Sequence, residues 1–402
     1  MDPDEGEIVN CDVLVVGGGP IGSTAARFAA KNCSGHVLVI EKRQEIGSPV
    51  RCAEGVSLSW LDELEIERSE HFINKKVLGA KLYSPSGHQM TIGKEIAGDE
   101  VGAVVERDTF DKEMAVLAGI EGVDYSLKTS AVDVIQENGV VKGVKARKMG
   151  NNFEIHSDLV IGADGFESQI GRWADIYGAI APKDIMSCFQ YRMTNIDFDP
   201  DYTHFFLGSD APGGYVWIFP KSEESANVGL GIQLSQLDGT KSPKDYLDEF
   251  IEKNEWLEQG QEVDMVSGGV SVAAPPEKVT KDGLMLVGDA SRVVDPITGG
   301  GIANGMKQAK ICGEIAAKAV KDDDFSEDFF SEYEERWRER LENKLWRNYM
   351  AKEKAVELDD DEFDMIIDAL ADEDIEEMST EAILKAVGEK YPDLVESFED
   401  ML

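Results

Sequence analysis

The chain has 402 residues, a hydrophobic content of 42% and a formal net charge of −39. This length predicts two or three folding units, and the composition is typical of a globular protein. No apolar run reaches the roughly 18 to 20 residues that a membrane-spanning helix requires. The excess of carboxylates disfavours a nucleic-acid partner, because a phosphate backbone would be repelled.

The cysteines and the start of the chain indicate a cytoplasmic protein. The first residues, Met1 to Glu5, lack the basic region and the apolar stretch of a secretory signal. The cysteines are scattered singly and match neither a disulfide framework nor the paired spacing of a zinc or iron–sulfur site, so no metal is expected. They are Cys11, Cys33, Cys52, Cys188 and Cys312.

The first 41 residues predict a β-α-β unit. A short apolar run, Cys11 to Val16, is typical of a buried strand, and the alanine-rich stretch Ser23 to Lys31 is typical of a helix. The next apolar run, Val37 to Ile40, predicts a second strand that ends at Glu41. This order and length are those of a dinucleotide-binding core.

A glycine-rich turn joins the first strand to the helix. Gly17, Gly19 and Gly22 hold its first, third and sixth positions, which serve the tight turn, the close approach of a pyrophosphate and helix–strand packing. The helix amino terminus then faces the phosphates with unpaired N–H groups. Glu41 follows Gly22 by 19 residues, where a carboxylate can bind an adenosine ribose. The pattern predicts nucleotide binding but does not separate FAD from NAD.

The remaining chain predicts sheets followed by helices. Apolar and polar residues alternate from Val132 to Gly165 around Asn138-Gly139, which indicates a hairpin that leads into a buried strand, Leu159 to Ile161. More sheet is expected from Asp197 to Gly231, where aromatic residues interleave with turn signals. From Gly301 onward the pattern is helical.

Two further motifs favour FAD over NAD as the cofactor. Gly162-Ala163-Asp164-Gly165 and Leu286-Val287-Gly288-Asp289-Ala290 each follow an apolar strand, and both resemble motifs of the para-hydroxybenzoate hydroxylase superfamily of flavoproteins. The resemblance implies FAD as the cofactor, with Asp289 beside the ribityl chain and pyrophosphate and with Arg107 near the ribose and phosphates. Without it, Asp164 and Asp289 could be ordinary turn residues, and Arg107 an ordinary surface arginine.

Three consecutive glycines, Gly299 to Gly301, precede the helical part of the chain. Backbone N–H groups at Gly300, Gly301 and Ile302 could lie against the pyrimidine edge of the flavin, where a helix amino terminus stabilises the negative charge of the reduced ring. A flexible loop is the alternative.

Two further segments, Ser48 to Gly55 and Tyr215 to Pro220, indicate one family within this superfamily. Together with Arg347 to Lys354, these segments are similar to the geranylgeranyl reductase family, and the similarity covers nearly the whole chain. Archaeal members of that family saturate the isolated double bonds of digeranylgeranylglycerophospholipids. Ala53 departs from the family, because close relatives often have glycine there. The resemblance implies further FAD contacts at Arg51, Cys52, Ala53, Gly55 and Ala131.

The expected fold is α/β, with mixed α+β character. A Rossmann-like FAD-binding domain made of residues 7–75, 100–175 and 275–325 is interleaved with an antiparallel-sheet substrate domain made of residues 76–99 and 176–274. Residues 326–402 are expected to form a C-terminal helical region.

Reduction of an isolated alkene requires a proton for one carbon and a hydride from reduced flavin for the other. Positive charge then develops transiently, and aromatic faces stabilise it. Tyr215 and Trp217, two apart on an expected strand, would point to the same side and line a polyprenyl tunnel, unless they only pack a core.

The family resemblance places Cys52 near the isoalloxazine ring of the flavin. A thiol there could donate a proton or guard a resting state, while an inert buried thiol is the alternative. A pairing between Cys52 and Cys312 cannot be judged from the sequence.

A basic and an apolar stripe run along the helix expected at Trp337 to Lys354. The basic residues are Arg336, Arg340 and Lys344, and the apolar residues are Trp337, Leu341 and Leu345. This helix could meet a bilayer or hold a lipid phosphate, although packing of the stripe on the body is the simpler expectation. Because the acidic segment Asp359 to Glu377 would be repelled by anionic headgroups, any contact with the cytoplasmic face of the membrane would be peripheral.

Two other functions stay open from the sequence. A flavin monooxygenase of the same superfamily would act on an aromatic or isoprenoid substrate with molecular oxygen, and a noncatalytic flavin- or lipid-binding carrier would bind without turnover. An electron-transfer flavoprotein dehydrogenase is disfavoured because the chain lacks the clustered cysteines of its iron–sulfur centre. NADPH, ferredoxin and a reduced deazaflavin coenzyme are all compatible as electron donors.

Overall fold

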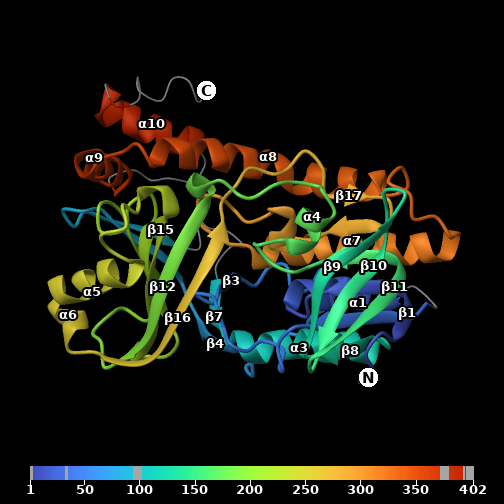
Figure 1. Cartoon of the computed structure of the whole chain (residues 1–402). Helices are drawn as coiled ribbons and strands as arrows, with labels where there is room; N and C mark the ends of the chain where they lie inside the picture. Colours follow the sequence, from blue (N-terminus) through green and yellow to red (C-terminus); the bar gives the residue numbers. More distant parts are fainter. Residues whose placement is uncertain (1–2, 32–34, 94–101, 372–379, 393, 395–402) are drawn as a thin grey trace. The chain divides into compact units, whose positions relative to one another are not determined.

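The chain passes back and forth between two units in the computed structural model (Figure 1). The structure describes residues 3–31, 35–93, 102–371, 380–392 and 394. This interleaving agrees with the predicted fold, while the predicted domain limits stay a prediction. Unit 1 consists of Met1–Val50, Arg107–Ile180 and Ser271–Arg347, and unit 2 consists of Arg51–Glu106, Ala181–Val270 and Asn348–Leu402.

An eight-stranded sheet forms the centre of unit 1. Its parallel strands lie in the order β8, β2, β1, β11, β18, and β9, β10 and β17 join by antiparallel pairing. The strands are β1 (Ile8–Val16), β2 (Val37–Glu41), β8 (Asp124–Leu127), β9 (Thr129–Glu137), β10 (Val140–Lys148), β11 (Asn151–Gly162), β17 (Thr280–Lys281) and β18 (Leu284–Leu286).

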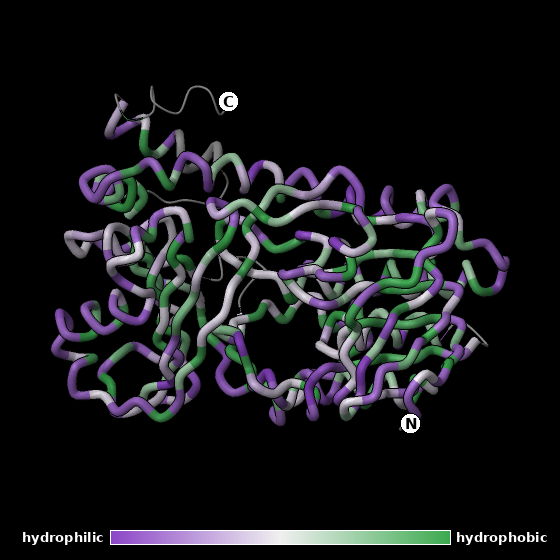
Figure 2. The backbone as a smooth tube through the Cα atoms, viewed as in Figure 1, coloured by the Kyte–Doolittle hydropathy of each residue, from purple (hydrophilic) through white to green (hydrophobic). Residues whose placement is uncertain are grey.

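Central strands of unit 1 are apolar because both of their faces are buried. Successive residues of β1, Val13 to Val15, are fully buried, and such strands are coloured hydrophobic in Figure 2. Helix α1 (Pro20–Lys31) packs along α7 (Ile302–Asp322), where a Cβ on Gly313 would lie 2.5 Å from the backbone oxygen of Ala25. The unit also contains α3 (Arg107–Ile120) and α4 (Gln169–Trp173).

The predicted elements of unit 1 are confirmed, with longer bounds. The strand expected at Cys11–Val16 begins at Ile8, and the helix expected at Ser23 begins at Pro20. The Asn138-Gly139 hairpin is present, and both residues have the positive φ that this tight turn requires, 51° and 89°.

A seven-stranded sheet forms the centre of unit 2, in the order β16, β12, β15, β14, β13, β5, β6. Most pairs are antiparallel as expected, but β13 runs parallel to β5. No short hairpin joins these two strands, so antiparallel pairing is not imposed. The strands are β5 (Gly79–Tyr83), β6 (Gln89–Gly93), β12 (Ile185–Thr194), β13 (Tyr202–Phe206), β14 (Tyr215–Pro220), β15 (Ser225–Gln233) and β16 (Gln261–Ser271).

One face of this sheet is covered by α5 (Pro243–Lys253) and α6 (Glu255–Glu258). Phe250 and Leu257 of these helices pack with Val228 and Leu230 of β15. The opposite face carries the aromatic residues described below. A separate three-stranded sheet is made of β3 (Gly55–Ser57), β7 (Gly102–Val105) and β4 (Ile73–Lys76).

Helices dominate the chain after Gly301, as predicted. They include α8 (Ser331–Ala355), α9 (Asp360–Ala371) and α10 (Thr380–Lys390). Trp337, Leu341 and Leu345 of α8 are buried in the core of unit 1, so this apolar stripe packs on the body and is not presented to a bilayer. Within the described residues, no helix is long and apolar enough to span a membrane. Part of the predicted acidic segment, 372–377, lies outside the described residues.

Replacing Trp337 by alanine should lower the free energy of unfolding by about 3–5 kcal/mol, because the mutation empties a fully buried site. Trp346 lies on the same helix but is 44% exposed, so Trp346→Ala is the matched control and should cost less than about 1 kcal/mol. Chemical denaturation measures both values. Equal losses would contradict the packing assigned to α8.

Candidate active site

The glycine turn after β1 has the geometry of a dinucleotide site. Gly17 has φ +112°, and a Cβ there would lie 2.3 Å from the backbone oxygen of Ala163. A Cβ on Gly22 would lie 1.9 Å from the oxygen of Gly17. A Cβ on Gly19 would meet no protein atom within 4 Å. Gly17 and Gly22 therefore have no room for a side chain, while Gly19 leaves open space where a pyrophosphate can approach the backbone.

Glu41, at the end of β2, is tied to this turn. One carboxylate oxygen accepts a hydrogen bond from the Gly18 N–H at 3.0 Å, and the other accepts from the Arg43 N–H at 2.9 Å. Each oxygen has a second lone pair, so the carboxylate can still accept a ribose hydroxyl.

Asp164 has unused hydrogen-bonding capacity. Its Oδ2 accepts from the Ile170 N–H at 3.0 Å, but its buried Oδ1 has no hydrogen-bond partner in the described part of the chain. Burial raises the pKa of Asp164, and hydrogen bonds from backbone N–H groups partly oppose the increase. An unsatisfied buried oxygen is unfavourable unless a bound group pairs with it.

Asp289, Arg107 and the triple glycine are brought together in unit 1. A Cβ on Gly301 would lie 2.9 Å from the Asp289 Oδ1. Burial raises the pKa of Asp289, and the charge of Arg107 opposes this. Arg107 begins α3 and holds the buried carboxylate of Asp111 through two hydrogen bonds of 2.8 and 2.9 Å. It is therefore not an ordinary surface arginine.

Gly301 caps the amino terminus of α7, and Ile302 is the first residue of this helix. The first N–H groups of a helix have no partner within it and favour an anionic group. Gly300 directly precedes the cap. Ala131 lies in β9 opposite Ala146.

Together these residues fit an FAD molecule. The open side of Gly19 suits its pyrophosphate, Glu41 suits its ribose, and the unsatisfied Asp164 oxygen suits a hydroxyl donor. FAD supplies a hydride donor when it is bound and reduced.

An aromatic row lies on the face of the unit 2 sheet opposite α5 and α6. Tyr215, Trp217 and Phe219 alternate along β14, with ring centroids 6.1 and 6.5 Å apart. The prediction that Tyr215 and Trp217 point to the same side is confirmed. Phe205 of β13 contacts both Tyr215 and Phe219 edge-on.

Two glycines on β15 make room for this row. Gly231 pairs with Tyr215, and Gly229 pairs with Trp217. A Cβ on Gly229 would lie 2.6 Å from the indole ring of Trp217. The indole therefore lies across the glycine and donates a hydrogen bond from Nε1 to the Gln190 side chain of β12 at 2.9 Å.

The segment Arg51 to Gly55, here called the Cys52 turn, is held on the same face. The Gln190 amide donates to the Cys52 carbonyl at 3.3 Å, and the Asn227 amide donates to the Ala53 carbonyl at 3.1 Å. A Cβ on Gly55 would lie 2.6 Å from the ring of Phe219. Thus the structure brings Cys52, Ala53 and Gly55 together with the aromatic row. Arg51 is exposed beside Gly268 of β16.

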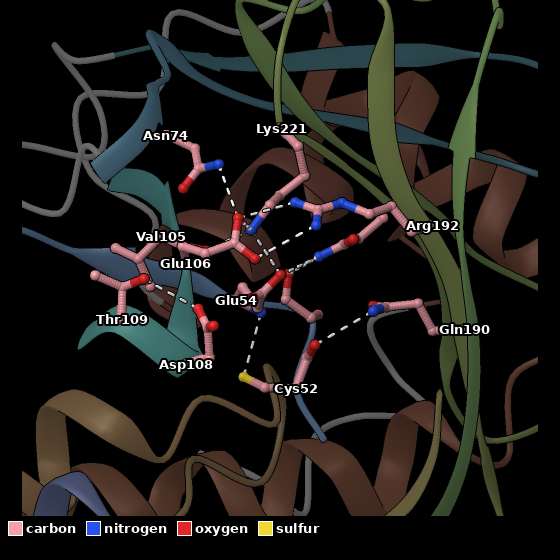
Figure 3. Close-up of polar contacts among 12 residues, drawn as sticks. Cys52, Glu54, Asn74, Val105, Glu106, Asp108, Thr109, Gln190, Arg192 and Lys221 are labelled. Atoms are coloured by element: carbon pink, nitrogen blue, oxygen red, sulfur yellow. Dashed lines mark hydrogen bonds and ion pairs between the residues drawn. The ribbon is translucent and has the colours of Figure 1, made fainter. Parts of the chain in front are cut away.

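Four charged side chains, including that of Glu54 in the Cys52 turn itself, form a cluster at the turn (Figure 3). Lys221, directly after β14, is buried and contacts Glu54 at 2.7 Å and Glu106 at 3.1 Å. Arg192 donates to Glu106 at 2.9 Å. Burial acts to raise the pKa of Glu106, but hydrogen bonding to Arg192 and the charge of Lys221 outweigh it and lower the pKa to about 2.

Four residues of this site were not predicted from the sequence, namely Gln190, Asn227, Glu54 and Lys221. The available signal was a polar side chain at a buried strand position, because Asn227 interrupts the apolar β15 and Gln190 is one of the few buried residues of β12. Most of their partners lie more than a hundred residues away in the sequence, as in the Lys221–Glu54 pair, and no local pattern identifies such contacts.

The described cysteines, Cys11, Cys52, Cys188 and Cys312, are free thiols. Cys312 is buried in the core of unit 1. Burial raises the pKa of Cys188 to about 12, and the charge of Cys52 adds to the increase. Cys33 lies outside the described residues.

Residues 12–176 match the family model for FAD dependent oxidoreductases, and residues 184–270 match the geranylgeranyl reductase catalytic domain. A digeranylgeranylglycerophospholipid reductase from Thermoplasma volcanium is 48% identical over 393 residues, which cover 97% of the chain and 99% of that relative. One from Picrophilus torridus is also 48% identical, with 98% and 100% covered.

The chain belongs to the digeranylgeranylglycerophospholipid reductase family. As a member of this reductase family, it is an FAD-dependent oxidoreductase. A crystal structure of a geranylgeranyl bacteriochlorophyll reductase-like protein from Thermoplasma acidophilum is 47% identical, with a TM-score of 0.92 over 98% of this chain and 100% of that chain. A flavin-dependent brominase with a TM-score of 0.68, 21% identical over 98% of this chain and 93% of its own, shares the fold.

Replacing Gly19 by alanine should weaken FAD binding by tenfold or more, roughly, because the methyl group occupies the approach of the pyrophosphate. The unfolding midpoint of the flavin-free protein should not change, because this methyl meets no protein atom within 4 Å. Gly22→Ala should lose both stability and FAD binding. Gly119→Ala, in an open position of α3, is the control and should lose neither. Flavin titration with unchanged affinity in Gly19→Ala would refute the site.

Glu106 should make stability depend on acid pH. Its pKa is lowered in the folded state to about 2, so its contribution is complete above its ordinary value of 4.5 and is lost as the pH falls from there towards 2. Glu106→Gln should flatten the fall of the unfolding midpoint in this window. Glu223→Gln removes an exposed carboxylate paired with Lys75 and should leave the slope as in the wild type. Parallel curves for all three proteins would contradict the assignment.

Proposed function

We propose that the chain hydrogenates the isolated double bonds of geranylgeranyl chains on digeranylgeranylglycerophospholipids, in the biosynthesis of archaeal membrane lipids. Full-length similarity to reductases with that printed name supports the substrate. The observation that carries the proposal is the aromatic row over Gly229 and Gly231, which lies on the same sheet face as the Cys52 turn.

The row suits a reaction that creates positive charge in an apolar chain. An isolated alkene has no carbonyl to accept charge, so protonation of one carbon leaves the other electron-poor. The faces of Tyr215 and Phe205 stabilise such a centre through their quadrupoles. Tyr215 is partly exposed on this face, whereas Trp217 is only 7% exposed and uses its N–H to hold Gln190. We assign the electrostatic role to Tyr215 and a supporting role to Trp217.

Cys52 is the proposed proton donor. The Glu54 N–H donates to its sulfur at 3.2 Å. A thiol whose sulfur accepts a hydrogen bond can still direct its S–H towards a substrate carbon. In this proposal the cofactor contacts are Gly17, Gly19, Gly22, Glu41, Arg51, Cys52, Ala53, Gly55, Arg107, Ala131, Asp164, Asp289, Gly300, Gly301 and Ile302.

A lipid substrate and an external reductant complete the proposal. The phospholipid requires at least transient contact with a bilayer, which we propose to be peripheral. The electron donor stays a prediction among NADPH, ferredoxin and a reduced deazaflavin coenzyme, and a chemical reductant can replace it in the assay.

The purified protein with bound FAD, reduced by dithionite, should convert digeranylgeranylglyceryl phosphate without oxygen into products heavier by two hydrogen atoms per saturated bond. Mass spectrometry and flavin reoxidation follow the reaction. A product formed only with oxygen would identify a monooxygenase, and tight lipid binding without turnover would identify a carrier.

Tyr215→Leu should lower kcat in this assay by roughly tenfold or more, because it removes the aromatic face from the charged intermediate. Tyr215→Phe keeps the face and should stay within about threefold of the wild type. Phe206→Leu is the control, since Phe206 stacks on Tyr83 on the opposite face of the sheet. A Tyr215→Leu protein with wild-type kcat would exclude this role.

A further inference from the structure

The Cys52 turn rests on a buried ammonium group. The Lys221 side chain is 1% exposed, and its Nζ contacts three oxygens from two segments of unit 2, the Cys52 turn and residues 105–106. It donates at 2.7 Å to Glu54 and to the Val105 carbonyl, and it lies 3.1 Å from Glu106. Figure 3 shows these groups converging at the turn. A buried ammonium is retained only where it is paired this completely.

Glu54 has a backbone conformation that needs support. Its φ is +74°, in the left-handed region that a glutamate adopts only at a cost. Its buried carboxylate accepts hydrogen bonds from Lys221 and from the Asn227 amide, both at 2.7 Å. These two contacts oppose relaxation of the residue to an ordinary conformation.

A second ion pair balances the charges of the cluster. Glu106 accepts from Arg192 at 2.9 and 3.3 Å and from the Asn74 amide at 2.9 Å. Two carboxylates and two cations therefore share the site, and loss of one partner leaves an uncompensated charge.

The conformation of Glu54 fixes the position of the Cys52 thiol. The Glu54 N–H donates to the Cys52 sulfur at 3.2 Å, and the Glu54 carbonyl accepts from the Val105 N–H at 2.9 Å. Because φ is the rotation about the N–Cα bond, a change in φ at Glu54 would rotate Cys52 and Ala53 relative to the held side chain and carbonyl of Glu54 and would displace the thiol. The lysine thus acts on the thiol through one residue.

We propose that Lys221 is a positioning residue that sets the orientation of the Cys52 thiol by holding Glu54 in its left-handed conformation. The role of that thiol in lipid reduction rests on the proposed function, whereas the effect of Lys221 on the turn does not. A small displacement of a reacting group costs turnover more than binding, because it lengthens the path of the transferred proton.

Three variants of the full chain with bound FAD test the proposal. Lys221→Met leaves the Glu54 charge buried without its main partner. Lys221→Met/Glu54→Gln removes both charges and so restores charge balance without restoring the hold on Glu54. Lys81→Met is the control, because it removes another ion pair of unit 2, Lys81–Asp199 at 2.6 Å, away from the Cys52 turn.

Hydrogen exchange of the peptide that contains residues 52–55 should accelerate by roughly tenfold or more in the single and the double variant, and not in Lys81→Met. The double variant should recover the unfolding midpoint that the single variant loses. Despite this recovery, kcat for the lipid should stay roughly tenfold or more below the wild type, with KM changed by less than about threefold.

Recovery of both exchange protection and kcat in the double variant would overturn the proposal, since Lys221 would then only neutralise Glu54. Unchanged exchange in both variants would overturn it as well. If Lys221→Met does not fold, the double variant alone tests the proposal. If the double variant does not fold either, Asn227→Ala, which removes the other contact to the Glu54 carboxylate and leaves no charge unpaired, is measured in its place. A wild type that reduces no lipid refutes the proposed function, while the exchange measurements still decide the role of Lys221.

Discussion

A Cβ on Gly22 would lie 1.9 Å from the backbone oxygen of Gly17, so no side chain fits at this position of the glycine turn. This contact brings the start of α1 against the end of β1 and the neighbouring Ala163. Helix α1 then meets α7 through Gly313, and α7 begins at the glycines beside Asp289. One steric constraint therefore aligns the phosphate turn, the central sheet and the second helix amino terminus. The tight packing of Gly17 and Gly22 holds the open position at Gly19 in place for a pyrophosphate.

In unit 2, two aromatic residues of β14 differ in burial and in their contacts. Trp217 is buried, lies over Gly229 and donates a hydrogen bond to Gln190. Gln190 in turn donates to the Cys52 carbonyl. Tyr215, two residues earlier, stays partly exposed. Residues that look equivalent in the sequence thus have different tasks, since one orders the turn and the other presents an aromatic face. The glycines of β15 permit both.

Local patterns predicted the parts of the fold that local physics determines. The glycine turn, the first strands and helix, the Asn138-Gly139 hairpin and the shared side of Tyr215 and Trp217 all follow from spacing and backbone preference. The parallel pairing of β5 with β13 does not, because these strands are distant in the sequence. The Lys221–Glu54 pair also joins residues that are distant in the sequence, and it depends on tertiary packing and charge balance, so it could not be predicted from local patterns. Nucleotide binding at the glycine turn and Glu41 also followed from spacing, whereas the choice of FAD and the proposed substrate came only from family resemblance.

The threading of the chain through each unit has a consequence for its synthesis. Strand β18 follows β11 by more than a hundred residues, yet it covers the edge formed by Val160 and Ile161. Until residues 284–286 leave the ribosome, that apolar edge stays open to wrong partners. The nascent chain therefore completes its nucleotide-binding sheet only late in translation, and a shortened protein that ends before β18 would carry an edge prone to aggregation.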